Sequence, residues 1–101
     1  MCMLIINNMK FKLGTVVETA GVNQARQNDK MFSNEIDKCF ARYCNADWSD
    51  MEYDDDKVMN DEAIANGNDR IFATYNTSKG KIYIITEWDR SVTTILFPEE
   101  Y

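Results

Sequence analysis

The sequence predicts an α+β domain in which helices pack on one face of an antiparallel β-meander sheet. Two runs rich in β-branched and aromatic residues, Lys81–Glu87 and Val92–Phe97, flank a four-residue turn and predict a hairpin. A third run of this kind, Arg70–Thr77, precedes them across a Ser-Lys-Gly turn. Helical periodicity prevails between an N-terminal strand and these three runs. The expected order is therefore β-α-α-α-β-β-β, with about four strands in one domain spanning residues 1–101.

The hairpin is expected at the centre of the sheet. Its four-residue turn places Thr86 opposite Thr93 and Ile84 opposite Ile95. One face would then carry Ile82, Ile84, Thr86, Thr93, Ile95 and Phe97, and the other Tyr83, Ile85, Glu87, Val92, Thr94 and Leu96. Both faces are mostly apolar, so we expect the second face to meet another surface as well.

The N-terminal third begins with a short apolar run, Met3–Ile6, within residues 1–9; it fits either an edge strand or a disordered leader. Lys10–Glu18 predicts a strand, and Gly14 within it predicts a bulge or bend. Thr19 is a suitable N-cap for a short helix over Ala20–Asn28.

Two further helices are expected. The first covers about Ser33–Asn45, and an apolar stripe marks its core face: Phe32, Ile36, Cys39, Phe40 and Tyr43. An irregular connector with Trp48 at its middle follows, and we expect this indole to close the edge of the core. The second covers Asp54–Asn66 and ends at Gly67. Three aspartates in its first turn meet the positive end of the helix dipole.

Composition excludes several classes of function. The net charge is −6, which disfavours direct binding to nucleic acid and favours a basic protein partner. The chain has no histidine, which removes imidazole-based catalysis and histidine metal ligands. Its three cysteines lack paired spacing, so we expect a reducing, cytoplasmic location. No segment has the length or character of a membrane span or a signal peptide, and no cofactor or metal site is predicted.

Two places carry candidate partner-binding residues. The first is the acidic stretch from the connector into the third helix: Trp48, Asp50, Glu52, Asp54, Asp55 and Asp56. The second is the hairpin turn: Glu87, Trp88, Asp89 and Arg90. At that turn the alternatives are a carboxylate pairing with Arg90 to hold the turn, a recognition site, or acid–base chemistry.

The C-terminal sequence IITEWDRSVTTILFPEEY, together with FARYCNADWSDM, NDEAIANG and RIFATY, resembles a family of small proteins carried on bacterial plasmids, phages and other mobile elements. The resemblance covers Phe11–Tyr101. It implies genomic context and fold, and no settled activity. A histidine would be expected near Tyr43, where this chain has tyrosine. Residues that the resemblance singles out are Trp48, Glu87, Asp89, Arg90, Ser91, Thr93 and Thr94.

The function predicted from the sequence is a non-catalytic acidic binding protein of a mobile element, inhibiting a host defence nuclease or other nucleic-acid-binding machinery by charge complementarity. The acidic stretch would supply the contact, with Glu99 and Glu100 at the C-terminus. One alternative is a homodimeric structural module that uses the second sheet face. Another is a small-ligand binder or hydrolase that uses Glu87, Asp89 and Arg90.

Overall fold

The computed structural model describes residues 10–101, so the predicted strand or leader at Met3–Ile6 lies outside the described residues. The α+β class and the predicted element order are confirmed, with a 3-10 turn added at the C-terminus. The elements in chain order are β1 (Thr15–Glu18), α1 (Ala20–Asn28), α2 (Lys30–Cys44), α3 (Asp54–Asn66), β2 (Ile71–Thr77), β3 (Gly80–Thr86), β4 (Val92–Leu96) and η1 (Pro98–Glu100).

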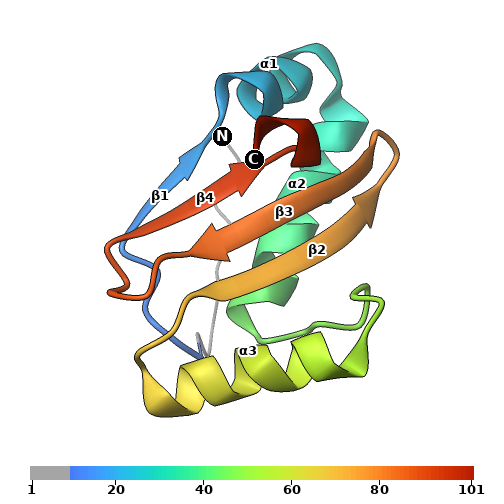
Figure 1. The fold of residues 1–101 in the computed structure, drawn as a ribbon. Coiled ribbons are helices and arrows are strands. Elements are labelled where there is room, and N and C mark those ends of the chain that lie inside the picture. Colours follow the sequence, from blue (N-terminus) through green and yellow to red (C-terminus); the bar gives the residue numbers. More distant parts are fainter. Residues whose placement is uncertain (1–9) are drawn as a thin grey trace.

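The four strands form one mixed sheet in the order β1-β4-β3-β2 (Figure 1). The meander of β2, β3 and β4 is antiparallel, its hairpin is central, and the predicted register of Thr86 opposite Thr93 is confirmed. The purely antiparallel sheet is wrong, because β1 pairs with β4 in parallel, Thr15 opposite Val92. Parallel neighbours need a long connection, and the chain between β1 and β4 contains all three helices.

The first strand is also shorter than predicted, four residues in place of the nine of Lys10–Glu18. Gly14 has a left-handed backbone, with φ of 64°. Its Cα lies so close to the backbone of Arg90 and Ser91 that an added Cβ would overlap their carbonyl oxygens. β1 begins directly afterwards, where Thr15 N donates to Ser91 O at 3.1 Å. Gly14 therefore marks the start of the strand and fits it against the hairpin turn.

Side-chain caps fix the first two helices. Thr19 caps α1 as predicted, since its hydroxyl accepts from Val22 N. α2 begins at Lys30, three residues before the predicted start, because the carboxylate of Asp29 accepts from Phe32 N and caps it there. Glu100 accepts from the hydroxyl of Thr19 at 2.7 Å, so the predicted C-terminal contact residue is held at the start of α1.

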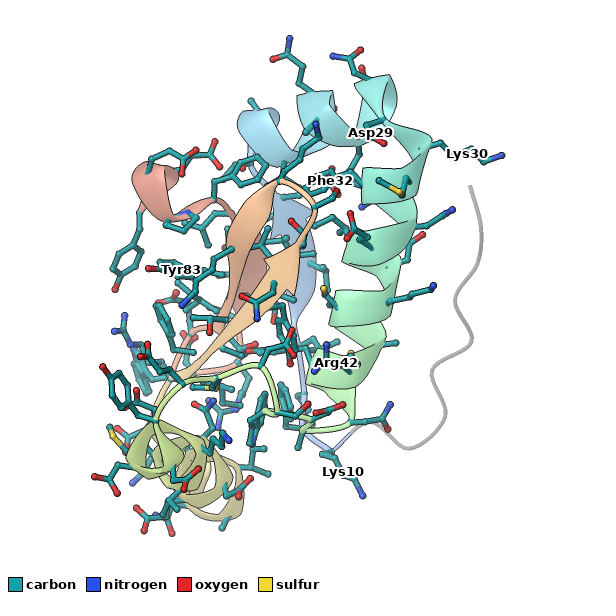
Figure 2. All side chains as sticks on the ribbon, turned by 90° about the vertical axis from the view of Figure 1, so that its right-hand side faces the viewer. Lys10, Asp29, Lys30, Phe32, Arg42 and Tyr83 are labelled. Carbon is teal, nitrogen blue, oxygen red and sulfur yellow. The ribbon has the colours of Figure 1, made fainter. Side chains whose placement is uncertain are left out.

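The sequence predicts all three helices on one face of the sheet, and this prediction is wrong for α3. α1 and α2 cover one face of the sheet, whereas α3 runs along the outer side of β2 (Figure 1). The predicted stripe of α2 faces the core, with Phe32, Ile36 and Tyr43 fully buried. In Figure 2, Phe32 lies on the α2 side of the sheet, and Tyr83 and α3 lie toward the opposite side.

A chain of buried hydroxyl groups crosses the core face of the sheet. Thr93 donates to Leu13 O at 2.7 Å, so its oxygen is free to accept from Thr86, also at 2.7 Å. The single proton of Thr86 is then used, and Thr86 accepts from Tyr43 at 2.7 Å. The hydrogen bonds therefore run one way, from Tyr43 through both threonines to the backbone before β1. Burial raises the pKa of Tyr43, which keeps its hydroxyl protonated.

Among residues 10–101, no α-helix lies across the second face of the sheet, here called the outer face, and α3 lies only at its edge beside β2 (Figures 1 and 2). Ile85 and Leu96 on this face are nevertheless buried by their neighbours. Tyr101 follows η1 back over the sheet and meets Phe72 and Tyr83 edge-on, at centroid distances of 5.8 and 5.9 Å. The monomer's own aromatic packing thus covers part of the surface that was expected to meet something else, and the homodimer stays a prediction.

Candidate functional site

The acidic charge of the chain is concentrated in one segment, residues 50–69, here called the acidic segment. Of 17 acidic and 11 basic residues, the segment holds eight carboxylates and one lysine, a net charge of −7. The rest of the chain holds nine carboxylates and ten lysines and arginines, a net charge of +1. The segment comprises α3 and the loops at its two ends. The net charge of −6 is therefore a local field and not a uniform surface property.

Polar contacts fix α3 against the edge of the sheet. The amide of Asn60 accepts from Phe72 N at 3.1 Å and donates to Phe72 O at 2.9 Å, so it replaces a neighbouring strand at that point of β2. Asp50 likewise accepts from Asn76 N at 3.0 Å. Trp48 Nε1 donates to Asp61 at 2.9 Å. The bonds of Asn60 and Asp50 occupy backbone groups of β2 that an added strand would otherwise use.

A groove of about 690 Å³ lies between α3 with its preceding loop and the outer face of the sheet. The α3 side supplies carboxylates, from Glu52, Asp56 and Glu62, together with the exposed side chains of Tyr53 and Met59. Within the described part of the chain, none of these three carboxylates makes a hydrogen bond or an ion pair. The wall is therefore negatively charged and open to a ligand.

The opposite side of the groove is an aromatic cluster that carries an arginine. Phe72 packs on Tyr83 at 4.8 Å between centroids, and Tyr101 meets both rings. The guanidinium of Arg70 lies over Phe72 at 5.4 Å and over Tyr101 at 5.9 Å. It also donates to the hydroxyl of Tyr101 at 2.7 Å. This side therefore holds a planar cation through ring contacts and one hydrogen bond to a phenol.

The structure brings two of the predicted residues, Glu52 and Asp56, into the groove. Asp54 and Asp55 are exposed on the first turn of α3 outside it, where Asp54 pairs with Lys57 at 3.3 Å. The side chain of Asp50 accepts from Asn76 N and pairs with Arg42, so its contacts are internal. Trp48 is only 5% exposed and is a core residue, as its expected edge-closing role requires.

The hairpin turn is held differently from the predicted carboxylate pairing with Arg90. Arg90 has a left-handed backbone, φ 60°, and its guanidinium donates to the carbonyl oxygens of Ala63 at 2.9 Å and Asp69 at 2.6 Å. It therefore satisfies the C-terminal end of α3 and the loop that follows. Asp89 accepts from Ser91 N at 3.0 Å. Trp88 is 63% exposed at the tip, and Glu87 is exposed beside it.

Sequence reasoning missed the sheet side of the groove, which carries two cations as well as aromatic rings: Arg70, Phe72, Thr74, Lys81 and Tyr101. One observation could have found it. The alternation in β2 places Phe72 on the face opposite Ile71 and Ala73, and those two residues are fully buried. A phenylalanine on the non-core face of a strand indicates a second apolar contact there. The position of Tyr101 beside it could not be read from spacing.

Arg42 forms a second charged cluster in the last turn of α2, on the α2 side of the sheet (Figure 2). Its guanidinium binds Asp47 at 3.1 Å and Asp50 at 3.0 Å. Hydrogen bonds from Ser49 and Arg42 lower the pKa of Asp47 to about 2. Arg42 likewise lowers the pKa of Asp50 below its ordinary value. This cluster holds the loop from which the acidic segment starts.

We expect the free energy of unfolding to fall as the pH is lowered from about 5 to about 2. Asp47 and Asp50 have lower pKa values folded than unfolded, so their stabilisation is complete above the ordinary value of 3.8. It is lost as the pH falls through the folded values. Urea titrations at several pH values should show that the free energy of unfolding depends less on pH in Arg42→Met than in the unchanged protein. The variant should be less stable at pH 7, and the difference should shrink toward pH 2. Parallel curves for the two proteins would contradict this.

Among the described residues, no group of three or more histidine, cysteine or acidic side chains is placed to hold a metal ion. The search of the same residues finds no helix with the length and apolar character needed to cross a membrane. Comparisons with models of protein families, with curated proteins and with solved structures yielded no match. The function must therefore be argued from the site itself.

Proposed function

We propose that this protein is a non-catalytic binding protein that presents the acidic segment to the basic surface of another protein. The partner class we propose is a protein that binds nucleic acid, and specifically a host defence nuclease of the CRISPR or restriction type. The protein would inhibit the partner by occupying its nucleic-acid channel. The observation that carries the proposal is the division of charge, −7 on residues 50–69 against +1 on the rest of the chain.

Electrostatics supports this class of partner over others. A surface of this sign repels phosphate backbones, so direct binding to nucleic acid is disfavoured. It complements the lysine- and arginine-rich channels through which nucleases hold nucleic acid, and it accelerates association with them. Five carboxylates of the segment make no side-chain hydrogen bond or ion pair among residues 10–101 and are available to an external partner: Glu52, Asp55, Asp56, Glu62 and Asp69. The mobile-element setting rests on the family resemblance of the C-terminal sequence.

The test is displacement of a labelled DNA duplex from a panel of purified restriction and CRISPR nucleases at 50 and 300 mM salt. We expect displacement from at least one nuclease at low salt, and weaker displacement at high salt, because charge contacts are screened. The double variant Asp54→Asn/Asp55→Asn should bind that nuclease about tenfold more weakly at low salt. Neither residue lines the groove or contacts the core, so the fold should tolerate the change.

The matched comparison is Glu87→Gln/Glu99→Gln, which removes the same charge from two exposed positions outside the acidic segment that the sequence also predicted as contact residues. We expect it to weaken displacement less than twofold, a change of only about 0.4 kcal/mol. Equal losses in the two variants would mean that net charge and not this segment directs binding. Failure to displace DNA from any nuclease of the panel at low salt would overturn the proposed partner class.

A further inference from the structure

The groove beside α3 differs from the rest of the acidic surface because it joins charge to apolar contact area. Two thioethers, Met51 and Met59, and the ring of Tyr53 line it together with the carboxylates. A volume of about 690 Å³ lies within the range of small-ligand sites, so the groove accepts a few side chains and not a whole helix or strand. The exposed acidic residues around it would meet the remainder of the partner's surface.

The edge of β2 restricts how a partner can enter. Strand addition needs free backbone donors and acceptors along the edge. Those of Phe72 are taken by Asn60, and the N–H of Asn76 is taken by Asp50. A partner that approaches the groove must therefore be recognised through its side chains.

The chemistry of the walls selects the type of side chain. Arg70 already shows the mode of contact, with a guanidinium lying flat over aromatic rings and one N–H donating to a phenol. A guanidinium is planar, weakly hydrated and able to bind a carboxylate through two N–H groups at once. A lysine ammonium is compact and strongly hydrated, and it gains less from rings and thioethers.

We propose that the groove between α3 and the outer face binds an arginine side chain of the protein partner. The carboxylates of Asp56 and Glu62 and the ring of Tyr53 would contact its guanidinium. This inference rests on the proposed function, and it specifies the residue of the partner that the acidic segment recognises. The arginine enters beside Arg70, which keeps the sheet side of the groove in place by holding Tyr101.

The probe is a ten-residue peptide with three arginines separated by glycine and serine, compared with the same peptide carrying lysines. Both are titrated against the protein at 50 mM salt. We expect the arginine peptide to bind about fivefold or more tightly than the lysine peptide. Labelling the methionine methyl groups with ¹³C reports the location: Met51 and Met59 signals should shift, while Met31, exposed on α2, should not.

Three variants complete the test. Asp56→Asn/Glu62→Gln should weaken the arginine peptide about tenfold, and Tyr53→Ala should abolish the preference for arginine over lysine. Asp54→Asn/Asp55→Asn carries the same charge change outside the groove and should weaken both peptides equally and by less. Thermal melting confirms that each variant is folded.

The outcomes separate the two proposals. Binding that depends on salt and on the acidic segment, with no arginine preference and no shift of Met51 or Met59, would overturn the groove while leaving the proposed function intact. Binding of neither peptide would overturn the groove, and the DNA displacement experiment then decides the proposed function on its own. Association of the protein with itself at the groove, seen as methionine shifts that depend on protein concentration without peptide, would replace the partner with a second copy and overturn the inference.

Discussion

Replacing Gly14 with alanine is expected to lower the free energy of unfolding by about 3–5 kcal/mol, a large part of the 5–15 kcal/mol typical of a domain this size. A left-handed backbone costs a non-glycine residue about 1–2 kcal/mol by itself. The added Cβ would also overlap the carbonyl oxygens of Arg90 and Ser91, which are backbone atoms and cannot rotate away. Relief requires β1 to separate from the hairpin turn, which breaks the bond from Thr15 N to Ser91 O.

Gly67→Ala provides the matched control. Gly67 also has a left-handed backbone, with φ of 71°, but a Cβ there meets nothing within 4 Å. Gly67→Ala should lower the free energy of unfolding by about 1 kcal/mol, which is the cost of a left-handed backbone without any steric overlap. Urea unfolding followed by tryptophan fluorescence measures both variants. If the two glycines gave equal losses, the close approach of β1 to the hairpin turn would contribute nothing.

The second large effect is expected at Thr93, where valine should lower stability by about 2–4 kcal/mol. The substitution keeps the shape but removes two hydrogen bonds from a fully buried site. Leu13 O loses its donor, and the hydroxyl of Thr86 loses its acceptor. The buried carbonyl of Leu13 is thereby left without its donor, and the Thr86 hydroxyl keeps only its bond to Tyr43, which together cost more than a lost bond between exposed groups.

The direction of the hydroxyl chain gives this prediction its controls. Tyr43→Phe removes the first donor and a long contact of 3.4 Å to Ile71 O, while Thr86 keeps its bond to Thr93, so we expect a loss of about 1 kcal/mol. Thr94→Val makes the same chemical change on the outer face of β4, next along the chain. It should change stability by less than about 0.5 kcal/mol. If Thr93→Val and Tyr43→Phe lowered stability equally, the chain of hydroxyl groups would have no single direction. If Thr94→Val lowered stability as much as Thr93→Val, burial of the hydroxyl would not matter.

The candidate site was half accessible to sequence reasoning. Glu52 and Asp56 were identified because consecutive carboxylates before and within the first turn of a helix are visible in a sequence. Arg70, Phe72 and Tyr101 were missed because their proximity depends on β2, α3 and the C-terminus meeting in space. Arg90 was expected to pair with a carboxylate or to bind a partner, whereas its guanidinium donates to backbone carbonyls of α3, of the loop after it and of the turn itself. No sequence pattern records a bond between a side chain and a distant carbonyl.

By itself, the sequence determined the α+β class, the central hairpin and its register, because side-chain periodicity and a four-residue turn are local properties. It also determined the amount of acidic charge and the absence of histidine. Only the tertiary structure decided the parallel pairing of β1 with β4, the position of α3 at the sheet edge and the groove beside it. Apolar periodicity specifies which face of an element is buried and not which neighbour covers it. The choice among neighbours was made by long-range contacts, such as Gly14 against Ser91 and Asn60 against Phe72.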